Sequence, residues 1–440
     1  MTCHSMKKFL RITVLVVLVI WAAISLIRAV QQALSPQGGN DLYTYWYAGQ
    51  FLREGKDLYR TFIEGEKPTL PIVYLDRTVS DLRQIIQPNL VPAPASSPLA
   101  FFLLAPLAYL SWPLAKAVWL LINLALLGCV PYLVYRLFQE KGWLSPGEGI
   151  ALACAVVGLS STRNATASGQ ITFLILDLML GAVLLADRRP WLAGLLLGAA
   201  LSKYSLSLGV LLLFLLLEPK IRLVLTACLV QLVGLLALML VSGSGLTAIV
   251  HEYLLMVTLH AGMEGIHLAA LMRGSGQEAW IGLAWTLLVT IPIAFWRWKK
   301  AFRRYGQSLA ALGRIHLLVI LLLWALLAVY HRAYDAMVII VYIGLIAYLA
   351  KRTQAWNLSR SARIGILAFS LAGQLLLMIP SGNVTRGLLP AMLETVWGRV
   401  ENLTTTFLIL AFLGVGFFLL FHLRSRPAPA PLPANPQKSI

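Results

Sequence analysis

The chain carries a series of apolar runs that approach the length of a membrane-spanning helix. A helix needs roughly 20 consecutive apolar residues to cross the hydrocarbon core of a bilayer. Such runs recur from residue 9 to residue 423, and 59% of the 440 residues are hydrophobic while only 12% are charged. A water-soluble domain cannot hide so much apolar surface. The sequence therefore predicts an all-α, polytopic membrane protein.

The apolar runs divide into about twelve expected transmembrane helices. Two of them are short and meet near Lys203, where a charge interrupts the apolar pattern. If the run from Ser97 to Leu110 also crossed the membrane, every later basic cluster would face outward, so we expect it to form an interfacial or re-entrant helix on the outer surface. The expected spans are residues 9–29, 114–137, 148–165, 169–187, 190–203, 204–218, 221–242, 280–297, 308–329, 335–350, 362–380 and 404–423.

The basic residues indicate which side of the membrane each loop occupies. The chain has 36 Lys and Arg against 18 Asp and Glu, a formal charge of +18, but these residues stand in short clusters between apolar runs. Basic clusters favour the cytoplasmic side. The charge therefore reports topology and does not indicate a nucleic-acid partner. We expect a multi-pass protein of the plasma or inner membrane with an uncleaved first helix and both termini in the cytoplasm.

This topology predicts one integral membrane domain, residues 1–423, followed by a Pro-rich, disordered cytoplasmic tail, residues 424–440. The extracytoplasmic loops are expected at about 30–113, 243–279 and 381–403, with a short helix from Leu42 to Arg53 in the first of them. No sequence repeat is evident, which disfavours transporters built from inverted repeats.

Neither cysteine nor histidine spacing indicates a metal site. Cys3, Cys129, Cys154 and Cys228 lie at the N-terminus or inside apolar runs, so we expect no disulfide and no thiolate site. The three histidines of the loop 243–279 are spaced too widely for a metal signature. We expect no metal and no cofactor.

Four blocks of sequence resemble one family. The blocks are NDLYTYWYAGQFLREGKDLY, SPLAFFLLAPLAYLSWPLAKAVWLLINLALL, GQITFLILDLMLGAVLLADRRPWLAGLLLGAALSKYSLSL and YHRAYDAMVII, in that order from Asn40 to about Ile340. Together they resemble glycosyltransferase family 87, polyprenyl-phosphate-sugar-dependent enzymes of the GT-C superfamily, many of them mannosyltransferases. One departure is visible: the family tends to show a Tyr next to paired prolines where this chain reads Ala95-Ser96-Ser97-Pro98.

The resemblance implies a GT-C-like bundle and a sugar-transfer reaction at the extracytoplasmic face. The donor would be a hexose, most often mannose, on a polyprenyl phosphate, and the acceptor a lipid or a glycan. Such a transfer requires a base for the acceptor hydroxyl, and cations or hydrogen-bond donors for the leaving phosphate. We expect a direct displacement with inversion at the anomeric carbon.

Asp41 is the expected general base. An ionisable group at a membrane boundary in an aromatic setting indicates function, and in the resembling family an acidic residue at this place acts as the base. Alternatively, Asp41 only caps the helix that starts at Leu42, a position that suits Asp. Asp57 is the weaker candidate and is expected to be a solvated loop residue.

The expected donor-binding residues come from several parts of the chain. Lys203 is a charge at membrane depth, which is costly unless paired; it is expected to contact phosphate, although a lysine that snorkels to the interface would give the same pattern. His331 and Asp335, spaced i and i+4, are expected on one helix face with Arg332 beside them. The alternative is that Asp335 caps the helix while Arg332 lies among headgroups.

Three further polar residues stand out in the sequence. Gln170 lies where a helix begins, so it is expected either to bind the sugar or to hydrogen-bond the start of that helix, and Arg273 is a candidate phosphate contact. Asp177 lies in the middle of an apolar run and is interpreted as structural.

Two other function classes remain open at this level. A secondary transporter or a flippase of lipid-linked sugars would be equally apolar and basic, but should carry ionisable or broken helices near mid-membrane. A non-catalytic assembly protein would predict nothing special about Asp41.

Overall fold

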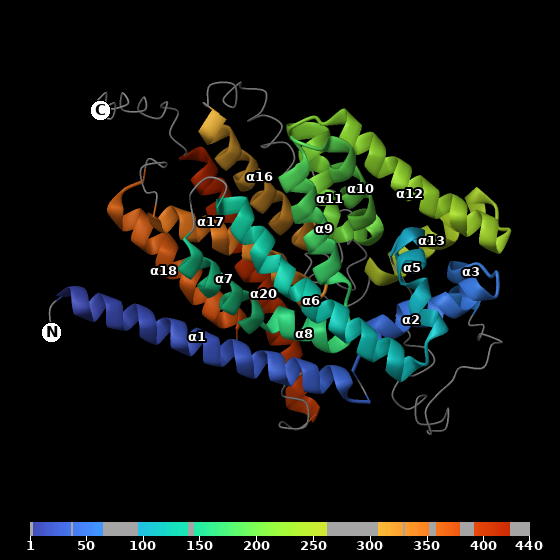
Figure 1. The fold of residues 1–440 in the computed structure, drawn as a ribbon, viewed down its shortest axis with the longest axis horizontal. Helices are drawn as coiled ribbons and strands as arrows, with labels where there is room; N and C mark the ends of the chain where they lie inside the picture. The colour runs from blue at the N-terminus through green and yellow to red at the C-terminus, as the bar shows by residue number, and fades with distance from the viewer. Residues whose placement is uncertain are drawn as a thin grey trace, which may run out of the picture.

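The computed structural model is all-helical over the residues it describes, and no strand occurs among them. Those residues are 3–36, 38–64, 96–139, 145–261, 307–328, 331–351, 358–378 and 391–422. An apolar environment offers no water to backbone N–H and C=O groups, and helices satisfy these groups within one segment. Figure 1 shows the resulting bundle, with one long helix, α1 (Cys3–Leu34), along its edge.

The described residues include six helices that are long and apolar enough to cross a membrane, or up to seven if a bent pair is one span. The expected total of twelve therefore stays a prediction. Outside the described residues lie the expected span 280–297, Arg273 and the tail 424–440. Of residues 307–312, at the start of the expected span 308–329, only the helical backbone is described. Among the described elements, the helices of more than 20 residues are α1, α6 (Trp112–Gln139), α12 (Ile221–Ser242), α16 (Gln307–Ala328) and α20 (Ala391–Phe421). The shorter helices α17 (Ile339–Lys351) and α18 (Arg360–Leu377) precede α20.

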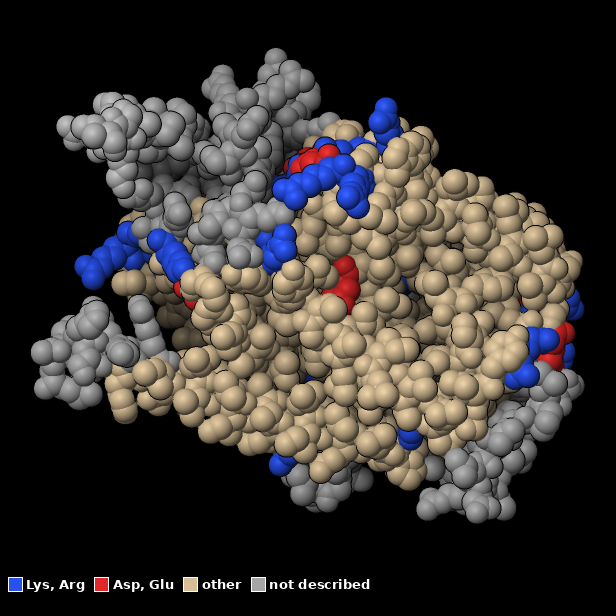
Figure 2. All heavy atoms as spheres, viewed as in Figure 1, with Lys and Arg blue, Asp and Glu red and all other residues tan. Residues whose placement is uncertain are grey.

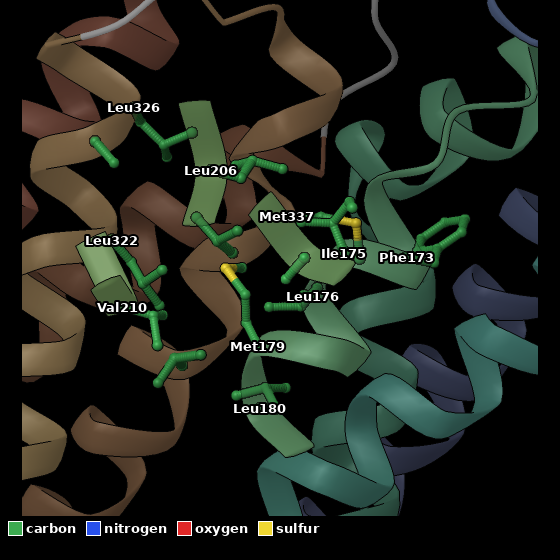
Figure 3. Close-up of a cluster of buried hydrophobic side chains, with 14 of the residues drawn as sticks. Phe173, Ile175, Leu176, Met179, Leu180, Leu206, Val210, Leu322, Leu326 and Met337 are labelled. Carbon is green, nitrogen blue, oxygen red and sulfur yellow. The ribbon is translucent and has the colours of Figure 1, made fainter. Parts of the chain in front are cut away.

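The core lies where the inner helices meet. Figure 3 shows Met179, Leu206, Leu322 and Met337, which come from different helices and point toward one another. All four are buried. Around the margin, by contrast, large apolar side chains such as Val17 are exposed, as expected for surfaces that face lipid. Figure 2 shows that most of the visible Lys and Arg side chains lie around the edge of the face in view, with only small traces of them in the wide area between.

The short runs that meet at Lys203 fold back on each other. They form α10 (Pro190–Ala200), the 3-10 turn η2 (Leu201–Lys203), α11 (Tyr204–Leu212) and η3 (Leu213–Leu217). By length alone Pro190–Leu217 could be one span. However, Asp187 before α10 pairs with Lys220 after η3 at 2.6 Å, whereas a straight helix of this length would separate its ends by roughly 40 Å. The segment is therefore a hairpin with Lys203 at its turn, as the sequence predicted.

A second break lies between residues 158 and 172. The expected spans 148–165 and 169–187 become α7 (Pro146–Gly158), α8 (Ser160–Ser168) and α9 (Thr172–Leu185), and α8 and α9 meet at 116°. Helix α8 has the polar sequence SSTRNATAS, and nearly all of it is buried. Gly169 ends it with a left-handed φ of 70°, a conformation that glycine adopts without steric cost. The expected boundaries were wrong because this polar stretch does not continue either apolar helix.

Four short elements form the end of the bundle that holds the first loop. Counting α5 (Pro98–Leu104) and the 3-10 helix η1 (Ala105–Tyr109) that follows it as one unit, they are α2 (Asn40–Arg53), α3 (Leu58–Glu64), α5–η1 and α13 (Leu246–Ala261). With seven and five residues, α5 and η1 are too short to cross a membrane. They pack closely against their neighbours: a Cβ on Gly49 of α2 would lie 2.6 Å from Ala108.

Candidate functional site

Lys203 and Asp335 form a short, buried ion pair. The Lys203 Nζ lies 2.5 Å from Asp335 Oδ1, and the two side chains are 13% and 3% exposed. The lysine comes from the turn of the α10–α11 hairpin, and the aspartate from the 3-10 helix η5 (Ala333–Val338). The alternative of a lysine that snorkels to the interface is wrong, because its ammonium group is held inside the protein by this carboxylate.

His331 and Thr172 complete the surroundings of Asp335. The Thr172 hydroxyl donates to Asp335 Oδ1 at 2.8 Å, and His331 Nδ1 lies 3.0 Å from Oδ2. The other ring nitrogen of His331 lies 3.2 Å from the carbonyl oxygen of Ser205. The predicted contact between His331 and Asp335 is confirmed, although a 3-10 turn and not an α-helix brings it about. The Asp335 carboxylate is thus held by donors on both oxygens and does not serve merely as a helix cap.

Gln170 joins this cluster from the break between α8 and α9. Lys203 Nζ donates to Gln170 Oε1 at 3.4 Å and to Thr172 Oγ1 at 3.1 Å. The ammonium group also lies 5.0 Å from the centre of the Tyr334 ring, within the range of a cation–π contact. Gln170 therefore lies beside the predicted cation Lys203, as expected for a residue that helps to bind the sugar-phosphate substrate.

Asp41 reaches the same region from α2. Arg332 Nη1 lies 4.0 Å from Asp41 Oδ1, and Asp41 is only 6% exposed. The start of α2 packs directly on the α8–α9 break, since the Gly39 N–H donates to the Ala167 carbonyl at 2.9 Å. The structure thus brings Asp41 and Arg332 together, next to the Lys203 cluster.

The alternative that Asp41 caps its helix is wrong. Helix α2 begins at Asn40, and the cap position is held by Gly39, whose φ is 77°. Asp41 lies within the first turn, where its negative charge is stabilised by the helix dipole but is not tied to a backbone N–H. Asp57, in contrast, is the cap of α3: its Oδ1 accepts from the Tyr59 N–H at 3.0 Å, and the residue is buried. The expectation of a solvated Asp57 was therefore wrong.

Tyr45 lies within the electrostatic reach of both carboxylates and was not predicted from the sequence. Burial raises the pKa of the Tyr45 hydroxyl, and the negative charges of Asp41 and Asp335 raise it further against the opposing hydrogen bond from Ser96. That hydrogen bond joins Tyr45 Oη and Ser96 Oγ at 2.8 Å. Tyr45 stands four residues after Asp41, so i, i+4 spacing was the signal that could have identified it.

The remaining polar groups lie outside this arrangement. The Asp177 carboxylate has no hydrogen-bond partner among the described residues. Within the same described ranges, no group of three or more His, Cys, Asp or Glu side chains could hold a metal ion, and the described cysteines are free. Arg273 lies in a segment that the structure does not describe.

The two carboxylates of the site, Asp335 and Asp41, have different surroundings. Asp335 is neutralised by Lys203 and fixed by two further donors. Asp41 has one described cation at the limit of ion-pair distance. Such a site can accept a proton at Asp41 and stabilise an anion at the nearby cations.

The family model of glycosyltransferase family 87 matches residues 97–380, more than half of the chain. The matched segment contains Lys203, Gln170 and the residues from His331 to Asp335. Helix α2 with Asp41 precedes it. A search of curated proteins finds no match.

Proposed function

The chain belongs to glycosyltransferase family 87, and we propose that this membrane glycosyltransferase transfers a hexose from a polyprenyl phosphate to a lipid or glycan acceptor. Mannose is the hexose we propose. The transfer takes place at the extracytoplasmic face of the membrane, and Asp41 is the general base. The observation that carries this proposal is the joint placement of Asp41, Arg332 and the Lys203–Asp335 pair in one site.

Asp41 suits the role of base better than Asp335. A general base needs a lone pair that faces the substrate, and both oxygens of Asp335 are already occupied by Lys203, Thr172 and His331. Asp41 is held only by Arg332, at 4.0 Å, among the described ion pairs. The acceptor hydroxyl gives its proton to Asp41 as its oxygen attacks the anomeric carbon.

Arg332 and Lys203 are the groups that stabilise the leaving phosphate. The Arg332 side chain is 36% exposed, so its guanidinium can reach a ligand, and a guanidinium suits phosphate oxygens. Lys203 has Asp335 as its partner, and Gln170 lies beside it with its amide oxygen accepting from the ammonium group. His331 is fully buried and holds Asp335 in place, so it positions the pair and does not contact the sugar phosphate itself. No acid is required, because the phosphate leaves as an anion.

The two broken segments favour one competitor. Transporters bind substrates at discontinuous helices, and both the α8–α9 break and the hairpin turn at Lys203 are of that kind. A flippase of lipid-linked sugars is therefore the second candidate. It predicts movement of the donor across the membrane with its sugar–phosphate bond intact.

The decisive experiment compares two Asp→Asn substitutions in purified protein reconstituted with a radiolabelled polyprenyl-phosphate mannose donor. Asp41→Asn removes the base, and the transfer rate should fall by roughly 10²–10⁴-fold. Asp57→Asn is the matched control, since both residues are 6% exposed and Asn caps a helix as well as Asp does. Transfer at the wild-type rate in Asp41→Asn would refute the assignment. Donor that crosses the bilayer uncleaved would support the flippase instead.

A further inference from the structure

A group of hydroxyl-bearing side chains lies next to the proposed site and takes no part in the chemistry described so far. Tyr45 Oη lies 2.8 Å from Ser96 Oγ, and the Tyr59 hydroxyl donates to the Ser96 carbonyl oxygen at 2.8 Å. The next residue, Ser97, donates its N–H to the Ser202 carbonyl oxygen at 3.1 Å. We call Tyr45, Tyr59, Ser96, Ser97 and Ser202 the hydroxyl cluster.

Several hydroxyls in and beside this cluster lack hydrogen-bond partners among the described residues. They are Ser97 Oγ and Ser202 Oγ, together with Thr44 Oγ1 on α2. The three residues are 8%, 1% and 5% exposed. A buried hydroxyl without a partner loses its hydration and gains nothing in return, so native proteins rarely leave one unsatisfied. An ordered water or a polar ligand can supply such partners, and here the unpartnered hydroxyls come from three segments of the chain.

Aromatic rings border the hydroxyl cluster. The Tyr59 ring packs edge-on against Phe101 at 6.1 Å and lies 5.4 Å from Tyr253 of α13. Tyr204, the residue after Lys203, lies 6.3 Å from Tyr253. Tyr204 and Tyr253 are partly exposed, whereas Tyr59 is fully buried. Rings with a hydroxyl tip offer an apolar face and a polar edge, which matches a sugar ring, whose C–H faces are apolar and whose edges carry hydroxyls.

The hydroxyl cluster begins one helical turn from the proposed base. Asp41 and Tyr45 are spaced i and i+4 on α2, and residues with that spacing lie on the same face of a helix. The charge on Asp41 contributes to the raised pKa of the Tyr45 hydroxyl, whose largest cause is burial. A sugar that contacts this cluster can therefore present a neighbouring hydroxyl to Asp41.

We propose that the hydroxyl cluster, with Thr44 and the rings of Tyr204 and Tyr253, binds the sugar of the acceptor, and that this acceptor is a neutral glycan. The inference rests on the proposed function and narrows the class of acceptor. The members of the cluster are uncharged, and Lys203, which stands between Ser202 and Tyr204 in the chain, is already paired with Asp335, so an anionic headgroup would find no unpaired lysine from this turn. One acceptor hydroxyl loses its proton to Asp41 and its oxygen bonds to the anomeric carbon. The bond from that carbon to the donor phosphate breaks, and the phosphate keeps the electron pair.

The test measures the Michaelis constants of donor and acceptor separately. The double variant Ser97→Ala/Ser202→Ala removes two unpartnered hydroxyls, and the acceptor KM should rise about tenfold, since each hydrogen bond contributes a few-fold. The donor KM should stay unchanged. Ser370→Ala is the control, because Ser370 is also buried but pairs with Tyr342 elsewhere. Thr44→Val, which keeps the side-chain volume, provides a second variant if the double variant does not fold.

The acceptor probes are methyl α-mannoside and octyl α-mannoside, which distinguish a free glycan from a lipid-linked one, and octyl phosphate tests the anionic alternative. Binding of methyl α-mannoside is also measured without turnover, by saturation-transfer NMR on the detergent-solubilised protein. A signal that weakens in the serine variants supports the subsite even if the donor has been misidentified. Three results overturn it: no mannoside binding to the wild type, competition by octyl phosphate alone, or variants that lose thermal stability with both KM values unchanged. In each case the outcome of Asp41→Asn still decides the proposed function.

Discussion

Replacing Lys203 with methionine removes the ammonium partner of Asp335, whose side chain is only 3% exposed. Removing one partner of a buried ion pair costs about 3–5 kcal/mol. Thr172 and His331 still donate to this carboxylate, so we expect a loss at the lower end, about 3 kcal/mol in the free energy of unfolding.

The reverse substitution should cost less. Asp335→Asn leaves the Lys203 ammonium group, which is 13% exposed and retains contacts with Gln170 and Thr172. We expect a loss of about 1.5–3 kcal/mol, the value of a hydrogen bond to a charged group, and toward the lower end because the amide oxygen of the new side chain can still accept from Lys203. In the double variant Lys203→Met/Asp335→Asn both charges are absent, and replacement of a whole buried pair is often close to neutral. The double variant should therefore be more stable than Lys203→Met alone.

The assay is reversible unfolding in mixed detergent micelles, with the free energy extrapolated to zero denaturing detergent. Lys220→Met is the matched control, because Lys220 forms a pair of similar length with Asp187, 2.6 Å, but the two side chains are 31% and 53% exposed. Exposed pairs contribute at most about 1 kcal/mol. If Lys203→Met cost no more than Lys220→Met, or if the double variant lost the sum of the two single losses, the buried pair would not have the role we assign to it.

Two further predictions follow from the described geometry. Gly169→Ala and Gly243→Ala each place a side chain at a left-handed φ, at a cost of about 1–2 kcal/mol. Of the two, only the new Cβ at Gly169 meets a neighbour, Leu42 Cβ at 2.9 Å. Gly169→Ala should therefore be the less stable variant and should also slow transfer, and equal thermal midpoints of the two variants would contradict this. Hydrogen bonding by Arg314 lowers the pKa of Asp187 to about 2 from 3.8, so its ion pairs stabilise the fold above about pH 4 and this stabilisation is lost as the pH falls toward 2. The thermal midpoint of the wild type should thus fall more steeply over that range than that of Asp187→Asn, and parallel curves would refute it.

The membrane class, the hairpin at Lys203 and the contact between His331 and Asp335 were predictable because each follows from local pattern. A charge between two short apolar runs indicates a turn, and residues four apart in sequence lie close where the chain turns. His331 precedes the 3-10 helix that carries Asp335, and the contact forms at that turn. The start of α2 was placed two residues late, since Gly39 caps the helix through its left-handed backbone and offers no side-chain signal.

The partners within the site were not predictable from local pattern. Thr172 binds Asp335 across 163 residues of sequence, and Lys203 does so across 132. Such contacts depend on how the α8–α9 break and the α10–α11 hairpin pack together. The burial of α8 was also unexpected, because the stretch SSTRNATAS is polar and would be exposed in most proteins.

The position of the site follows from the breaks in these helices. Polar backbone and charged side chains are tolerated at membrane depth only where protein or water surrounds them. Here the α8–α9 bend, the hairpin turn at Lys203, the 3-10 turn that carries Asp335 and the first turn of α2 all reach one region. Each break supplies a polar group that an unbroken apolar helix could not: Gln170, Lys203, Asp335 and Asp41. The α8–α9 break packs on the start of α2, since Gly39 donates to Ala167 and a Cβ on Gly169 would lie 2.9 Å from Leu42 Cβ. Gly169→Ala should therefore disturb the placement of Asp41 as well as that of Gln170.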